Sequence, residues 1–335
     1  MRAAARRPKP LDLLVSLCTL WVACGFFLDA WAHGHVPVET FFTPYHGVFY
    51  SGMLALAIVL AVFRRRIPRT YRLALIGVPV FILSGIGDLV WHRLLGVEEG
   101  VDALLSPTHQ GLGLGIFLLS SGPISSALNA RAQLRTLADH LPLILSLATW
   151  IELIHFGTAY AFDPGAWRPD APPPIRTYSP DYLTAVAMGY YKIGTGVLVV
   201  LFQSAIVAGF ALFAGTRFSL PFGSMTLIYL LGNAAAAAAF TNDTPLLATV
   251  LIMSVAAGLT ADVLIRRLRP RAENSTAYRL LGTVVPVAYF AAYFIVTALA
   301  GGVWWDWNVV LGATLWAGVI GFGLTLLAPP RAQAA

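Results

Sequence analysis

The sequence predicts an all-α protein, a polytopic bundle of membrane-spanning helices. Of its 335 residues, 58% are hydrophobic and only 11% are charged, whereas a typical soluble domain carries about 25% charged residues. The apolar residues also occur in runs of about 20, the length that a helix needs to cross a bilayer core of roughly 30 Å. The lipid bilayer is therefore the expected partner. The net charge of +6 is interpreted from where the basic residues lie along the chain, as a sign of membrane orientation. No nucleic-acid partner is expected.

The apolar runs divide the chain into ten predicted helices, mostly joined by short connections that favour antiparallel packing of neighbours. A Pro-rich outer loop at 163–180 separates a five-helix front half, 1–162, from a five-helix back half, 181–335. The approximate bounds of the ten helices are 11–32, 44–63, 71–95, 107–128, 139–162, 181–213, 222–240, 245–265, 278–299 and 303–327.

The basic residues predict the orientation of this bundle. With a cytoplasmic N-terminus, all but four of the 22 lysines and arginines fall at the cytoplasmic ends of the helices, as the positive-inside rule requires. The four exceptions are Arg93, Arg168, Arg176 and Lys192. Both termini are therefore expected in the cytoplasm. The chain is expected to be a multi-pass protein of the cell (plasma) membrane, with its acidic loops on the outer, periplasmic side.

Two stretches of the chain repeat the same order of polar residues, one from Asp29 to His46 and one from Asp88 to His109. Each contains an aspartate, a histidine four residues later, a short loop with acidic residues, and a Thr/Ser-Pro-x-His sequence that opens the next helix. Together they hold four of the seven histidines. An internal repeat of polar residues in an apolar chain is the first place to look for a site.

The spacing within each stretch brings its polar residues together. The aspartate and the first histidine are four residues apart and share one face of a helix. Thr43 and Ser106 are suited to be N-caps, and the proline after each occupies the favoured first helical position. His46 and His109 are then in the first turn of the following helix. A helical hairpin therefore brings one aspartate and two histidines to similar depth, and does so twice.

An Asp/His/His set inside a membrane points to a transition metal. An ionisable residue at the centre of a membrane helix costs about 2.5–3.5 kcal/mol on insertion scales, so such residues usually mark functional sites. Imidazole and carboxylate ligands suit copper, zinc or iron. Two other roles stay open, hydrogen bonding between helices and a proton path. The predicted ligands are Asp29, His33, His46, Asp88, His92 and His109.

A third pair of candidate ligands lies on the fifth predicted helix. Glu152 and His155 are three residues apart within the sequence TWIELIHF, so they share a helix face. Glu-x-x-His is the ligand pair that di-iron helix bundles direct into their cores. We therefore include both residues among the candidate metal ligands, at a site that could hold two metals.

The first of the two stretches resembles a family of copper membrane enzymes. The pattern is Asp29-x3-His33-x12-His46, with Phe-Thr-Pro-Tyr directly before the last histidine and Phe-Tyr three residues after it. It resembles the C subunit of particulate methane and ammonia monooxygenases over about residues 27–50. The resemblance implies that these three residues bind copper, that the protein is an oxidoreductase, and that additional membrane subunits are its partners. The second Asp/His/His set is not part of the family pattern.

The favoured function is therefore a copper-binding membrane protein, an oxidoreductase of the copper monooxygenase type, with no catalytic residue assigned. One alternative is a metal handling or transport protein that takes copper from the outer side. The chain has only five methionines and no Met-rich segment, which disfavours a copper(I) transporter because thioethers are the usual soft ligands. The other alternative is a membrane zinc hydrolase that acts on lipid.

Overall fold

In a computed structural model of the chain, all the described secondary structure is helical, and all ten predicted apolar helices are present. Nine of the helices in the described part are long and apolar enough to cross a membrane; α9, Ser224–Phe240, is shorter. These helices indicate a multi-pass membrane protein, as the composition predicted. The structure describes residues 10–36, 41–96, 98, 100–130, 134–158, 182–240, 244–270, 274–300 and 303–327.

The described residues form two compact units. The first unit lies within Met1–Tyr160 and Phe218–Phe240, and the second within Ala161–Arg217 and Thr241–Ala335. The predicted back-half helix α9 thus belongs to the first unit, where it packs against α6. The predicted Pro-rich loop at 163–180 lies outside the described residues.

A glycine explains why α9 can join this unit. A Cβ atom at Gly232 of α9 would lie only 2.7 Å from the Cβ of Ile151 on α6. The two helices therefore approach more closely than a larger residue would allow. This contact depends on the packing of distant segments, which helical periodicity in the sequence does not encode.

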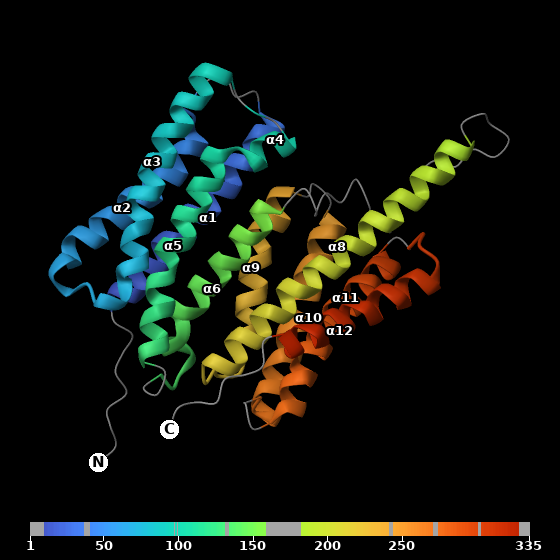
Figure 1. Cartoon of the computed structure of the whole chain (residues 1–335). Helices are drawn as coiled ribbons and strands as arrows, with labels where there is room; N and C mark the ends of the chain where they lie inside the picture. The colour runs from blue at the N-terminus through green and yellow to red at the C-terminus, as the bar shows by residue number, and fades with distance from the viewer. Residues whose placement is uncertain are drawn as a thin grey trace, which may run out of the picture. The chain divides into compact units, whose positions relative to one another are not determined.

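The first unit is organised around α1, which contacts α2, α5, α6 and α9, while α3 packs along α5 (Figure 1). Two 3-10 turns, Arg64–Arg66 and Arg69–Tyr71, join α2 to α3. The α1/α2 pair and the α3/α5 pair are the two hairpins that the repeat predicted. The helices of this unit are α1 Pro10–His35, α2 Pro44–Phe63, α3 Arg72–Leu95, α4 Gly100–Leu105, α5 Pro107–Ala130 and α6 Leu137–Gly157, together with α9.

Both hairpins are held by glycines at the points of closest approach. A Cβ at Gly77 of α3 would lie 2.7 Å from the carbonyl oxygen of Gly115 on α5, and a Cβ at Gly25 of α1 would lie 2.7 Å from the Cα of Phe49 on α2. Small residues of this kind let helix backbones come together in a membrane. The close contacts determine the relative height of the polar residues at the ends of the two hairpins.

A buried carboxylate ties the opposite end of the first unit together. Asp12, in the first turns of α1, accepts hydrogen bonds from the hydroxyls of Tyr71 at 2.6 Å and Ser126 at 2.8 Å. Ser16, one turn further along, donates to the carbonyl of Pro142 on α6 at 2.8 Å. These bonds join α1 to the start of α3, to α5 and to α6, and each buried oxygen of the Asp12 carboxylate has a partner.

In the part of the chain that the structure describes, the second unit contains four helices. Its central helix is α11, Ser275–Ala300, which contacts α8, α10 and α12. A close approach between α11 and α12 occurs at Gly282 and Gly321, where an added Cβ would overlap the facing backbone. This unit contains no histidine. The other three helices are α8 Tyr182–Arg217, α10 Thr244–Leu268 and α12 Trp307–Leu327.

Candidate metal centre

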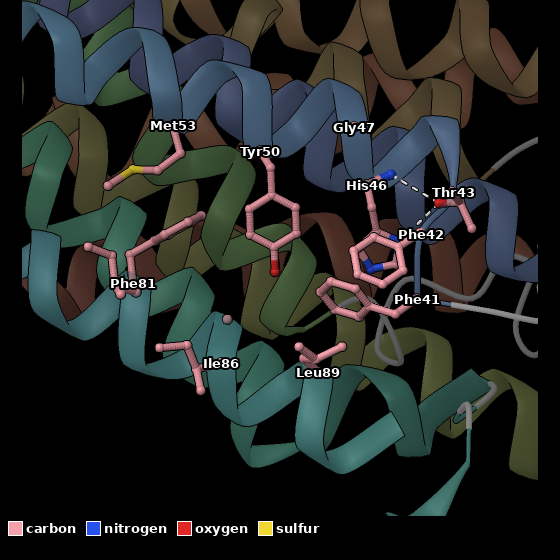
Figure 2. A pocket seen from close by; sticks show the side chains of 12 residues that line it. Phe41, Phe42, Thr43, His46, Gly47, Tyr50, Met53, Phe81, Ile86 and Leu89 are labelled. Atoms are coloured by element: carbon pink, nitrogen blue, oxygen red, sulfur yellow. Dashed lines mark hydrogen bonds between the residues drawn. The ribbon is translucent and has the colours of Figure 1, made fainter. Parts of the chain in front are cut away.

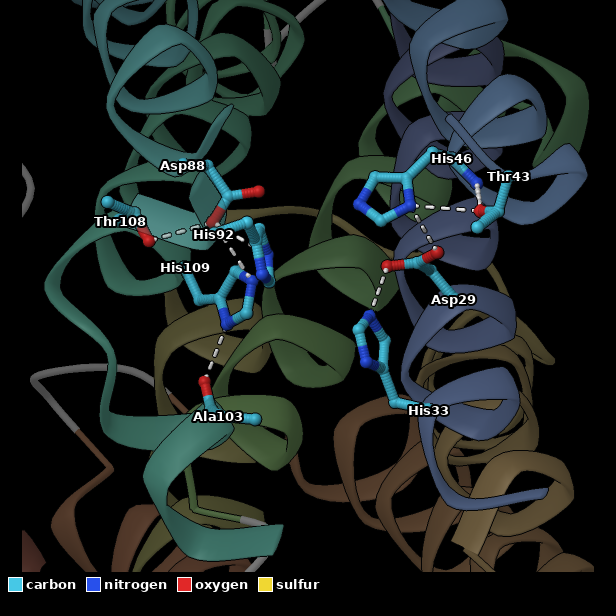
Figure 3. Close-up of polar contacts among 9 residues, drawn as sticks. All are labelled: Asp29, His33, Thr43, His46, Asp88, His92, Ala103, Thr108 and His109. Atoms are coloured by element: carbon cyan, nitrogen blue, oxygen red, sulfur yellow. Dashed lines mark hydrogen bonds and ion pairs between the residues drawn. The ribbon is translucent and has the colours of Figure 1, made fainter. Parts of the chain in front are cut away.

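The α1/α2 hairpin places the first aspartate between two imidazoles (Figure 3). Asp29 Oδ2 lies 3.5 Å from Nε2 of His33, one turn further along α1. Asp29 Oδ1 lies 3.1 Å from Nδ1 of His46 in the first turn of α2. The first predicted set of ligands is therefore assembled by one hairpin, as the spacing indicated.

A helix cap orients the ring of His46. Thr43 is the N-cap of α2, with Pro44 in the first turn, and its hydroxyl oxygen accepts a hydrogen bond from the backbone N–H of His46 at 3.1 Å. The same hydroxyl lies 3.0 Å from His46 Nδ1. The cap that Thr-Pro-x-His predicted is confirmed. Because Nδ1 of His46 faces both Thr43 and Asp29, its Nε2 is the nitrogen directed away from them.

The α3/α5 hairpin assembles the second set around Asp88. Its Oδ1 lies 3.2 Å from Nε2 of His109 and 3.6 Å from Nε2 of His92. His109 Nδ1 lies 2.7 Å from the carbonyl oxygen of Ala103 on α4. A carbonyl only accepts hydrogen bonds, so Nδ1 carries a proton and a neutral His109 ring presents a lone pair at Nε2. That lone pair faces a carboxylate oxygen, and only a proton or a cation can make this contact favourable.

Thr108 also belongs to the site, although the repeat did not predict a role for it. Its hydroxyl donates a hydrogen bond to Asp88 Oδ1 at 2.8 Å and lies 2.8 Å from the hydroxyl of Ser106. The carbonyl of Ser106 accepts from the N–H of Gln110 at 2.9 Å, as the carbonyl of an N-cap does. Ser106 therefore caps the start of α5 through its backbone carbonyl, while its hydroxyl contacts Thr108. The signal in the sequence was the hydroxyl residue between Pro107 and the histidine.

We expect Thr108→Val to lower the metal affinity by about 10- to 100-fold, because outer partners that orient a metal-ligating carboxylate contribute about that much. The substitution keeps the shape of the side chain and removes the hydrogen bond to Asp88. Competition with a chromophoric chelator measures the affinity. Thr149→Val is the matched control, since Thr149 is buried on α6 and its hydroxyl bonds to the Leu145 carbonyl. Equal affinities of the Thr108 variant and the wild type would contradict the assigned role.

The two sets meet and form one group, which we call the Asp/His cluster (Figure 3). The rings of His33 and His92 stack with centroids 6.2 Å apart and planes at 17°, and His46 lies 6.4 Å from His92. His92 is also 5.9 Å from His109. The cluster consists of Asp29, His33 and His46 from the first hairpin and Asp88, His92 and His109 from the second.

Two sets of three donors within the cluster have the compactness that a metal ion requires. In each set the donor atoms all lie within 4.8 Å of one another. One set is Asp29, His33 and His46, as predicted; the other is His46, Asp88 and His92, so His46 is shared. His109 lies outside both sets and contacts Asp88. Because His46 belongs to both sets, it joins the two hairpins.

Most residues of the cluster are buried, and it contains polar atoms without hydrogen-bond partners among the described residues. Asp88 is 1% exposed and His46 is 4% exposed. Among the described residues, neither ring nitrogen of His33 or His92 has a hydrogen-bond partner, and neither does Oδ2 of Asp88. Each buried polar group left in this way costs about 1–3 kcal/mol. Imidazole nitrogens and carboxylate oxygens that face each other without partners fit the donor set of a transition-metal ion.

Glu152 and His155 are buried on α6, but the structure does not add them to the cluster. Among the described residues, neither belongs to a set of three or more donors within 4.8 Å. Phe156, beside them in sequence, packs against Phe26 of α1 with ring centroids 4.1 Å apart and planes tilted by 34°, and the Phe26 ring lies 6.3 Å from His109. Aromatic side chains therefore occupy the edge of the cluster where α6 approaches.

Sequence reasoning also gave no role to the aromatic side chains that border the cluster. The Phe41 ring lies 4.8 Å from His46 and 6.2 Å from His92, and the Tyr50 ring stacks 6.1 Å from His46. These rings border a pocket of about 610 Å³ between α2 and α3 (Figure 2). The signal in the sequence was an aromatic residue one turn after His46 on the same helix face.

The fold and the site define a class: a multi-pass helical membrane protein with a buried cluster of aspartates and histidines. The chain matches no protein-family model, no curated protein and no solved structure. What the resemblance of residues 27–50 to the monooxygenase subunit implies therefore stays a prediction from the sequence.

Proposed function

We propose that the protein binds transition-metal ions, copper foremost, at the Asp/His cluster, and that the cluster is the redox centre of a membrane oxidoreductase. The observation that carries the proposal is the convergence of buried imidazole nitrogens and a carboxylate oxygen that have no hydrogen-bond partner among the described residues. Such groups are stable in an apolar bundle when a cation satisfies them, because unpaired buried polar groups are costly.

The composition of the cluster supports copper and accommodates zinc or iron. Four imidazoles supply strong donors for all three ions, and two carboxylates offset part of the positive charge. If His46 bound one ion through each of its ring nitrogens, the cluster could hold two ions close together. Bound copper would supply one-electron redox chemistry, and the resemblance of residues 27–50 favours this metal. The chain itself would hold the ion, orient its ligands through Thr43, Thr108 and the Ala103 carbonyl, and limit the access of water.

Metal analysis of the purified full-length chain tests the proposal. We expect copper to remain bound through dialysis after reconstitution, with zinc and iron bound less tightly. Elemental analysis reports the ratio of metal to chain. Absence of binding tighter than micromolar for all three ions would refute the metal centre. Rapid passage of copper across sealed proteoliposomes would favour metal transport, and zinc retention with release of fatty acid from lipid would favour the hydrolase.

The proposed orientation puts the cluster toward the outer side of the cell membrane, because the positive charges gather at the opposite ends of the helices. In whole cells, a membrane-impermeant maleimide is expected to label Gly100→Cys, at the start of α4, without permeabilisation. Arg65→Cys, in the turn after α2, is the internal control and is expected to react only after permeabilisation. The wild type gives the background, since its two cysteines lie within α1. Labelling of the Gly100 variant only after permeabilisation would invert the orientation.

A further inference from the structure

The pocket beside the cluster is elongated and follows two helices (Figure 2). Its lining residues on α2 and in the segment before it run from Phe41 to Met53, and those on α3 run from Phe81 to Leu89. Within each run they recur about one helical turn apart. Ten residues of helix, from Thr43 to Met53, span about 15 Å. The pocket therefore has the shape of a groove parallel to the helices, and its volume of about 610 Å³ lies within the usual range for small-molecule sites.

The two ends of the pocket differ in chemistry. The polar groups of Thr43 and His46 lie at one end, together with the rings of Phe41 and Phe42 and beside the Asp/His cluster. Met53, Phe81 and Ile82 form the other end and offer no strong hydrogen-bonding group. Tyr50 lies between them, and its buried hydroxyl has no hydrogen-bond partner among the described residues. A site with one polar end and a long apolar end fits a molecule with the same polarity.

A glycine keeps space for the tyrosine hydroxyl between the helices. A Cβ at Gly85 of α3 would lie 3.1 Å from the hydroxyl oxygen of Tyr50 on α2. With glycine at this position, the Tyr50 side chain extends across the groove toward α3. Tyr50 thus adds a hydroxyl that can donate a hydrogen bond midway between the two ends of the pocket.

The pocket lies next to helix surfaces of the kind that face lipid. Large apolar side chains beside the lining residues are well exposed, including Leu54 at 63% and Leu83 at 68%. Ile86, which lines the pocket, is itself 56% exposed. In a membrane-spanning bundle such surfaces contact acyl chains. A molecule dissolved in the bilayer can therefore enter between α2 and α3 without crossing water.

We infer that this pocket binds a single-chain amphiphile from the bilayer, a linear aliphatic chain with one small polar group. The polar group lies at the end formed by Thr43 and His46, and the chain extends toward Met53 and Phe81. The inference rests on the proposed function in one respect. If metal is bound at the cluster, the amphiphile is the substrate of the oxidoreductase. Its carbons nearest the polar group would then lie closest to the metal.

Photo-crosslinking of the full-length chain in phosphatidylcholine nanodiscs tests the inference. The probe is hexadecanoic acid with a diazirine in its chain, and peptide mass spectrometry maps the labelled residues. We expect labelling at Met53, Ile82 and Ile86 that excess unlabelled hexadecanoic acid suppresses. Leu315 on α12, in the second unit, is 68% exposed and serves as the reference for ordinary contact with lipid. Labelling of Leu315 is not expected to saturate. The inference is overturned if excess unlabelled hexadecanoic acid suppresses labelling of the pocket residues no more than it suppresses labelling of Leu315.

Variants that fill the pocket supply the second readout. A Cβ at Gly47 meets nothing within 4 Å, and Gly47 lines the pocket. Gly47→Phe is therefore expected to lower the saturable labelling by about tenfold, since the ring and the probe cannot occupy the same volume. Ile86→Trp fills the pocket from the α3 side and is expected to act in the same direction. Gly113→Phe, at an open position of α5 outside the pocket, is the matched control and is expected to label as the wild type does.

Metal content, measured on the same samples, separates this inference from the proposed function. Retained metal with lost labelling in both pocket variants supports the pocket as a distinct binding site. Saturable labelling in a wild-type protein that binds no metal would refute the metal centre and support the pocket. Unchanged labelling in both folded variants would refute the pocket, whatever their metal content.

Discussion

His46→Ala is expected to cause the largest loss of metal affinity among single substitutions in the Asp/His cluster. His46 is the one donor shared by both compact sets, so its removal breaks each of them. Loss of an outer partner of a metal ligand already costs about 10- to 100-fold in affinity, so loss of this shared donor is expected to exceed about 100-fold. Chelator competition and the ratio of metal to chain measure the change.

His35→Ala is the matched control for this prediction. His35 lies on the same helix end as His33, but its Nδ1 contacts the carbonyl of Trp31 at 2.8 Å and its ring stacks on Trp31. We expect the His35 variant to keep the wild-type affinity. Thermal unfolding of both variants shows whether the bundle is intact. A folded His46 variant with the affinity of the His35 variant would exclude His46 as a ligand.

The second large effect is expected from coupling between the hairpins. His33 and His92 come from different hairpins, yet their rings stack 6.2 Å apart. In a double-mutant cycle with His33→Ala and His92→Ala, we expect the losses of metal-binding free energy to be non-additive by about 0.5–3 kcal/mol, the range for residues in one network. Asp88→Ala is likewise expected to weaken retention at the first set of donors.

A cycle that pairs His33→Ala with His140→Ala controls for indirect effects. His140 lies at the start of α6, where Ser16 near the beginning of α1 bonds to the Pro142 carbonyl, whereas His33 is in the last turn of α1. These positions are at opposite ends of the bundle, and their effects are expected to add. Additive losses of one metal each in the His33/His92 cycle would instead show two independent sites.

The features that depend on local chemistry could be predicted from the residues alone. Runs of about 20 apolar residues predicted the helices, because a bilayer requires backbone hydrogen bonds to be satisfied within each segment. Thr43-Pro44 predicted the start of α2, because a threonine cap and a proline favour that geometry wherever they occur together. The four-residue spacing of Asp29 and His33 likewise predicted that they share a helix face. The helix ends differ by several residues in places: α6 stops at Gly157 where 162 was predicted.

Which residues from different hairpins meet depends on the packing of the helices in three dimensions. His46 joins Asp88 and His92, His109 turns its second nitrogen to the Ala103 carbonyl, and Glu152 lies outside the donor sets. Tertiary packing also forms the groove between α2 and α3 and places α9 beside α6. The physical reason is that these contacts depend on how closely the helices approach at positions such as Gly25, Gly77 and Gly232. Periodicity shows which face of a helix a residue occupies, but the partner of that face is chosen by the packing of the whole bundle.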